Sequence, residues 1–236
     1  MGQNLTRYAY WQLRDFIRER GIALIITSTL LGFSVIAPMR AMLGSNIAEP
    51  DARRILILAL PQVVYIGAFI ALNGIISTDR KFGYYRFLFS KPVSIPAYYA
   101  QYFVVSVLGF LAVFAFLLGI FSIVIRPINP LGALMFCALV YLSFGGIAFL
   151  VSSLVRYDWP ILAGIYLGSA LVNGFWSMET GWKMVVRNML PPLHQLQAAD
   201  MVNFGTVDTK AAVWLLGYSA ACFVAGLIVL WRRPIG

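Results

Sequence analysis

The sequence predicts an all-α integral membrane protein with six transmembrane helices. Of its 236 residues, 61% are hydrophobic and only 11% are charged, and the mean hydropathy is +0.81. This composition is typical of polytopic membrane proteins and lies outside the range of soluble globular domains. Six apolar stretches are each long enough to cross a lipid bilayer. We therefore expect one transmembrane domain that covers residues 1–236.

The first 20 residues have the pattern of an amphipathic helix. Leu5 and Leu13 recur with other apolar residues on one face, while Arg7 and Arg14 lie on the opposite face. A helix on the surface of a soluble domain would show the same pattern, but the chain offers no such domain for it to pack on. We expect residues 1–20 to form an interfacial helix in the membrane plane, and no cleavable signal peptide.

The six apolar stretches follow in order along the chain. They cover residues 21–39, 55–76, 98–125, 131–155, 160–176 and 211–231. Proline is best tolerated near the ends of helices, because it lacks the backbone N–H that a helix interior uses. We therefore expect Pro38 to end the first span and Pro61 to lie in the first turns of the second.

The distribution of charge predicts the orientation of these spans. The segments on the N-terminal side of the membrane hold 11 of the 18 basic residues and four of the nine acidic ones. The segments on the other side hold seven basic and five acidic residues. Loops rich in lysine and arginine stay in the cytoplasm. Both termini are therefore expected to be cytoplasmic, in a multi-pass protein of the cell (inner) membrane.

Residues 77–97, between the second and third spans, form a basic and aromatic interruption in the apolar chain. The basic side chains are Arg80, Lys81, Arg86 and Lys91, and Asp79 is the one acid. Aromatic residues lie between them at helical spacing: Phe82, Tyr85 and Phe89. Pro92 is expected to end this short helix. A helix of this kind either lies on lipid headgroups or fits a soluble partner.

Residues 177–210, between the fifth and sixth spans, form the longest segment on the predicted external side. Trp182, Val185 and Met189 make this segment too apolar for a free loop. We expect one or two short helices, broken at Pro191 and Pro192, that fold back against the membrane bundle. Such re-entrant helices are possible only where protein covers their backbone.

The sequence lacks the residue patterns of most membrane enzymes. His194 is the only histidine, and Cys137 and Cys222 lie in separate apolar stretches without metal-ligand spacing. The chain has no Gly-x-x-x-x-Gly-Lys-Ser/Thr loop for a nucleotide phosphate, and its spans have no chain of acidic or basic groups for proton or ion transfer. We expect no enzymatic activity, cofactor or metal in this chain, and no nucleic-acid partner, since the net charge of +9 is explained by membrane orientation.

Small and polar residues within the spans leave two interpretations open. Gly164 and Gly168 form a small-x-x-x-small pattern that lets helices approach closely, either within the chain or between chains. Polar side chains could line a translocation pathway or could bond helix to helix, and the candidates for the pathway are Thr27, Asn73 and Asn173.

The 77–97 segment resembles the loop motif of ABC-2-type exporter permeases. The matching residues are Asp79-Arg80, Gly83, Arg86-Phe87-Leu88, the run from Ser90 to Ser94, and Tyr98. The chain differs from the motif at Asp79, where glutamate is usual, at Phe89, where an aliphatic residue is usual, and at Ile95, where a basic residue often follows. About twenty residues carry the resemblance as a motif, and the whole chain carries it as an architecture.

This resemblance implies that the 77–97 segment holds a coupling helix that docks on a separate ATPase subunit. The implied contact residues are Asp79, Arg80, Phe82, Gly83, Tyr85, Arg86, Phe89, Lys91 and Pro92. It also implies two ATPase copies, which carry the ATP and magnesium, and a second permease chain that meets this one at Gly164 and Gly168. The 156–158 turn would add a second ATPase contact, and the 177–210 helices would cap the outer end of the pathway.

The expected function is therefore that of a membrane subunit of an ATP-driven exporter. A chain with neither a nucleotide site nor an ion relay needs an outside source of energy to move a substrate. Its apolar, aromatic spans favour a hydrophobic or amphipathic substrate. The alternative is a membrane scaffold or assembly factor whose basic loop binds lipid without transport. An integral-membrane transferase would need clustered acids or a nucleophile and base pair, which the sequence lacks.

Overall fold

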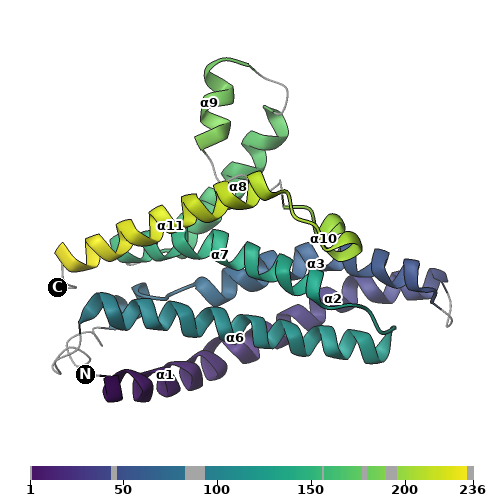
Figure 1. Cartoon of the computed structure of the whole chain (residues 1–236), viewed down its shortest axis with the longest axis horizontal. Helices are drawn as coiled ribbons and strands as arrows, with labels where there is room; N and C mark the ends of the chain where they lie inside the picture. The colour runs from purple at the N-terminus through teal and green to yellow at the C-terminus, as the bar shows by residue number, and fades with distance from the viewer. Residues whose placement is uncertain are drawn as a thin grey trace. The chain divides into compact units, whose positions relative to one another are not determined.

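A computed structural model of the chain describes residues 2–43, 47–82, 94–155, 157–176, 180–189 and 196–232. Within these ranges every regular element is a helix (Figure 1). Five helical stretches are long and apolar enough to cross a membrane: Tyr8–Met42, Glu49–Asp79, Ile95–Val124, Leu131–Leu154 and Thr209–Arg232. The chain is therefore all-helical, with the helix lengths and composition of a multi-pass membrane protein, as the sequence predicts.

The residues group into two compact units. Unit 1 contains Met1–Ala71, Val104–Tyr141 and Gln197–Val207. Unit 2 contains Leu72–Phe103, Leu142–Leu196 and Asp208–Gly236. Each unit therefore draws on three separate parts of the chain. The single transmembrane domain over residues 1–236 stays a prediction.

Unit 1 begins with helical segments that follow one another without a loop. Helix α1 (Gly2–Phe16) passes through a π-helical turn (Ile17–Gly21) into α2 (Ile22–Leu43). The Phe16 ring is fully buried, and a Cβ built on Gly109 of α6 (Ile95–Val124) would lie 2.5 Å from it. The amphipathic segment and the first span are thus one continuous helical path, and the membrane-plane orientation of α1 stays a prediction.

The buried guanidinium of Arg20 closes the end of α3 (Glu49–Leu72). Its Nη1 donates a hydrogen bond of 3.1 Å to the carbonyl oxygen of Ala71 in the last turn. The last four carbonyls of a helix have no partner within it, and a cation suits the negative end of the helix dipole. Arg20 therefore satisfies a backbone group that would otherwise be buried unpaired.

Two predictions about proline are wrong. Pro38 lies inside α2 and Pro61 lies well inside α3 rather than at a helix boundary. Sequence analysis began the second span at residue 55, after several charged residues. In the structure, Glu49 and Asp51 already form the first turn of α3, where acidic side chains stabilise a helix. Membrane helices continue through proline where neighbouring groups satisfy the freed carbonyl.

Helix α8 (Trp159–Phe175) is the shortest of the predicted spans. Its 17 residues extend about 25 Å at 1.5 Å per residue, against a hydrocarbon thickness of about 30 Å. Five of the six predicted spans, in α2, α3, α6, α7 (Leu131–Leu154) and α11 (Thr209–Arg232), meet the length needed to cross. The sixth crossing stays a prediction.

Unit 2 has a core where small residues let helices approach closely. The Ser219 hydroxyl of α11 accepts a hydrogen bond of 3.1 Å from the Gly146 N–H and donates one to the Leu142 carbonyl. These two backbone groups of α7 are partners in a regular helix, so α11 bonds directly to the α7 backbone. The rings of Phe149 and Phe223 pack beside this contact with their centroids 4.5 Å apart.

The predicted external segment contains two short helices on either side of the two prolines. They are α9 (Trp182–Met189) in unit 2 and α10 (Ala198–Phe204) in unit 1. Gly205, with φ of 64°, ends α10 in the left-handed conformation that favours glycine. The short helices agree with the sequence analysis, whereas their return into the membrane stays a prediction.

We expect Gly146→Ala to destabilise unit 2. A Cβ on Gly146 would overlap the backbone carbonyl of Ser219, and overpacking of a core costs about 1–3 kcal/mol. Thermal unfolding of the purified chain in detergent would show a lower midpoint. The matched control is Gly119→Ala on α6, where a Cβ meets nothing within 4 Å, so its midpoint should stay equal or rise. Equal midpoints for the two variants would contradict this packing.

Candidate functional site

The chain turns sharply where the second apolar stretch ends. Residues 73–76 form the turn after α3, and the short helix α4 (Ser77–Phe82) follows at once. Gly74 has a φ of 75°, a conformation in which glycine carries no steric penalty. Ile75 and Ile76 are buried, so the turn is held inside unit 2 rather than in solvent. Its backbone N–H groups therefore need partners within the protein.

Asp158 supplies the first of these partners. It stands directly before α8, yet its carboxylate makes no capping bond to that helix. Its Oδ2 accepts hydrogen bonds from the Gly74 N–H at 3.1 Å and from the Ser152 hydroxyl at 2.5 Å. The residue is only 2% exposed. A carboxylate at this depth is tolerated because its hydrogen bonds replace the lost water.

Ser152, near the end of α7, supplies the next partners. Its Oγ accepts hydrogen bonds from the N–H groups of Ile76 and Ser77, both at 3.3 Å. The same hydroxyl donates a hydrogen bond to Asp158 Oδ2. A hydroxyl has one proton to donate and two lone pairs to accept with, so this group is fully used. The N–H groups that it binds lie at the start of α4, where a helix lacks internal partners. Ser152 therefore caps α4 from another helix.

Two further contacts hold α4 along its length. The phenol of Tyr99, a fully buried residue of α6, donates a hydrogen bond of 3.0 Å to Asp79 Oδ2. The Lys81 ammonium lies 5.7 Å from the centroid of the Tyr157 ring, a cation–π contact. We call the four side chains that hold residues 74–81, namely Tyr99, Ser152, Tyr157 and Asp158, the α4 anchor.

The predicted ATPase-contact residues are described only in part. Asp79 lies in α4 and faces Tyr99. Arg80 and Phe82 belong to α4, but only their backbone is described. Outside the described residues lie Gly83, Tyr85, Arg86, Phe89, Lys91 and Pro92. The predicted contact surface therefore includes the second half of α4, and the rest of it lies outside the described residues.

The 156–158 turn, predicted as a second partner contact, has its acidic side chain buried. Asp158 is buried against the chain's own backbone, so its carboxylate is not accessible to another protein. Tyr157, which is 60% exposed, is the accessible side chain of this turn. Arg156 lies outside the described residues.

The predicted pathway and interface residues lie in separate places. Thr27 is half-buried on α2, Asn73 is exposed in the turn after α3, and the side chain of Asn173 lies outside the described part. Gly164 and Gly168 are on α8, and a Cβ built on either meets no described atom within 4 Å. The described part of the chain thus leaves these two glycines without packing partners.

Sequence analysis missed Ser152 and the pairing of Tyr99 with Asp79. Serine at the end of an apolar stretch is common and carries no distinctive signal. The one available signal was Asp158, an acid beside a membrane span, because a buried acid requires partners.

No family model, curated protein or solved structure matches this chain. The role of the α4 anchor is therefore argued from its own geometry. The acceptors and donors of Ser152 are taken by protein groups, and Asp158 Oδ2 binds a backbone N–H and a hydroxyl. This arrangement holds a short helix in place on the ends of neighbouring helices.

We expect Asp158→Ala to loosen the 73–82 segment. The change leaves the Gly74 N–H and the Ser152 hydroxyl without their acceptor, and an unpaired buried group costs about 1–3 kcal/mol. Hydrogen exchange followed by mass spectrometry should show amides 74–77 exchanging about tenfold faster or more.

The matched control is Asp200→Ala, which removes an exposed carboxylate from α10. This control should leave exchange at residues 73–82 unchanged. Asp158→Asn, which keeps an oxygen acceptor, should give an intermediate rate. Unaltered exchange at Gly74 in Asp158→Ala would contradict the anchor.

Proposed function

We propose that the chain is the membrane permease subunit of an ABC exporter. It moves a hydrophobic or amphipathic substrate across the cell membrane with energy from ATP hydrolysis by a separate ATPase subunit. The observation that carries the proposal is the α4 anchor. A short helix next to a basic, aromatic segment is fixed to α6, α7 and the residue before α8 by buried hydrogen bonds.

Such anchoring is what a force-transmitting helix requires. A partner that pushes on α4 displaces Asp79, Ile76 and Ser77, and their buried bonds pass the movement to other helices. Hydrogen bonds in a low-dielectric interior are strong and directional, so the attachment is stiff. Helices moved as rigid bodies by a docked ATPase can switch a cavity between inward and outward access.

The sequence supports the proposal that another protein chain supplies the energy for transport. It contains no phosphate-binding loop and no intramembrane chain of ionisable groups. In the proposed complex two ATPase copies hold ATP and magnesium, and this chain contributes Arg80, Arg86 and the neighbouring aromatic residues to the contact.

The proposal includes six membrane crossings, with α8 as the fifth in chain order. Seventeen residues lie at the lower end of the range of about 17–25 that spans a bilayer. Trp159 and Trp176 stand at the two ends of α8, as tryptophans do at membrane interfaces. The amphipathic helix α9 then follows at the outer surface, and both termini are cytoplasmic. Gly164 and Gly168 provide the close approach for a second permease chain.

We expect Arg80→Glu combined with Arg86→Glu to abolish binding of the ATPase. The two new glutamates would repel acidic groups in an ATPase groove, and reversing two close charge pairs costs several kcal/mol of binding free energy. The measurement is co-purification from cells that express the chain together with a candidate ATPase.

The matched control reverses two basic residues of the predicted external segments, Arg54→Glu with Lys210→Glu, and should keep binding. Co-purification that survives the Arg80 and Arg86 changes would refute the coupling-helix assignment. Loss of anionic-vesicle binding in that variant, with no ATPase bound by the wild type, would favour the lipid-binding scaffold instead.

We expect the two sides of the membrane to differ in accessibility at Ser90 and Thr206. Single cysteines, Ser90→Cys and Thr206→Cys, are placed in a chain whose Cys137 and Cys222 are changed to alanine. An impermeant maleimide applied to intact cells should label position 206 and not 90, because the charge distribution places residue 90 in the cytoplasm. Both should react after permeabilisation. The reverse pattern would overturn the orientation.

A further inference from the structure

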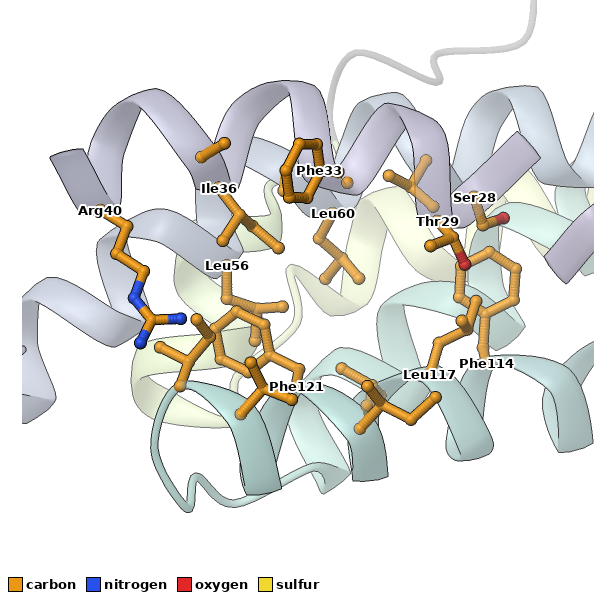
Figure 2. Close-up of a pocket in the computed structure, with 18 of the residues that line it drawn as sticks. Ser28, Thr29, Phe33, Ile36, Arg40, Leu56, Leu60, Phe114, Leu117 and Phe121 are labelled. Atoms are coloured by element: carbon orange, nitrogen blue, oxygen red, sulfur yellow. The ribbon is translucent and has the colours of Figure 1, made fainter. Parts of the chain in front are cut away.

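Unit 1 contains an elongated groove between α2, α3 and α6, with a volume of about 660 Å³ (Figure 2). This volume lies within the range of about 300–1,000 Å³ that is usual for small-molecule sites. Only three of its 19 lining residues are polar. The apolar walls include Phe33, Ile36, Leu56, Leu60, Phe114 and Phe121. The groove is therefore suited to a hydrocarbon chain.

The three polar residues lie at opposite ends of the groove. The hydroxyls of Ser28 and Thr29 are at one end and the guanidinium of Arg40 is at the other (Figure 2). Ser28 is only 4% exposed, and its Oγ has no hydrogen-bond partner in the described part of the chain. A serine in a helix usually bonds its own backbone when nothing else is offered, and no such bond is formed by Ser28.

Arg40 differs from Arg53 and Arg126, two other arginines of unit 1. Arg126 donates to the carbonyl oxygen of Ile47 at 3.0 Å, and Arg53 forms an ion pair with Glu49. The Arg40 guanidinium has neither a hydrogen bond nor an ion pair with any described residue. Its five donors are thus available to an anionic group at the mouth of the groove.

The length of the groove fits one leaflet of a bilayer. Thr29 and Arg40 are separated along α2 by about 16 Å at 1.5 Å per residue, which is close to half of the hydrocarbon thickness of about 30 Å. Thr29 is near the middle of the predicted first span, residues 21–39, so we expect Arg40 at the depth of the lipid headgroups, where arginine side chains extend to the interface.

We propose that this groove is a binding site for an anionic membrane phospholipid. One acyl chain lies along the apolar wall towards Ser28 and Thr29, and the headgroup phosphate binds the Arg40 guanidinium. This site does not depend on the proposed exporter function, since it involves unit 1 alone and no ATPase.

The test is native mass spectrometry of the full-length chain in mild detergent, titrated with phosphatidylglycerol and with phosphatidylcholine of the same acyl chains. We expect phosphatidylglycerol to bind about tenfold tighter, which corresponds to about 1.4 kcal/mol. Arg40→Gln should remove this preference. The matched control, Arg54→Gln, removes an exposed arginine of α3 that does not line the groove and should keep the preference.

A second variant tests the apolar wall. A Cβ on Gly32 meets only the side chain of Ile36 within 4 Å, so Gly32→Phe adds a ring to the groove lining without a clash at its Cβ. It should weaken both lipids at least tenfold while the unfolding midpoint stays within a few degrees of wild type. Glycerol phosphate, which offers the headgroup without acyl chains, should not displace the bound lipid.

Several outcomes would overturn the proposal. These are equal affinity of the wild type for both lipids, an equal loss in Arg54→Gln, or unchanged binding in Gly32→Phe. Displacement by glycerol phosphate would mean a phosphate site instead of a lipid site. A dimer that Gly32→Phe dissociates, without any effect on lipid, would mean that a second copy of the chain covers the groove.

Discussion

The two hydrogen bonds that the Asp158 carboxylate accepts are the interaction on which the buried turn of unit 2 depends. A turn buried at the end of α3 exposes backbone N–H groups to an apolar environment, where each unpaired group costs several kcal/mol. Asp158 accepts from Gly74 and orients Ser152, which in turn accepts from Ile76 and Ser77. One carboxylate and one hydroxyl therefore satisfy the turn and start α4, and the same bonds fix α4 to its neighbours.

The same constraint explains two buried or half-buried arginine contacts of unit 1. Arg20 donates to the carbonyl of Ala71 and Arg126 donates to the carbonyl of Ile47, so both arginines complete backbone hydrogen bonding near chain turns. In unit 2, the Ser219 hydroxyl of α11 likewise forms hydrogen bonds with backbone groups of α7. Ser28 and Arg40 differ from these residues because no described backbone group binds their side chains, and both line the apolar groove.

The proposed function gives the α4 anchor a purpose beyond stability. Helices that only need to be stable can be joined by a loose loop, whereas a helix that transmits work must be stiff in relation to the helices it moves. Under the proposed function, the basic and aromatic residues that follow α4 in the sequence would contact the ATPase, and the buried bonds of α4 would provide the stiffness. Transport would then depend on both parts, since the loss of either would uncouple the ATPase from the membrane helices.

The sequence by itself determined that the chain is helical and crosses a membrane, because the length and polarity of an apolar stretch are local properties. It also placed the short helices around Pro191 and Pro192. It misjudged Pro38 and Pro61, because it placed the helix ends at the borders of the apolar stretches, whereas α2 and α3 continue beyond these borders. Only the tertiary structure decided that Asp158 meets Gly74, 84 residues away, and that α2, α3 and α6 enclose a groove. No local pattern specifies such pairs, since many serines and acids could satisfy the same N–H groups and only the packing of the helices selects among them.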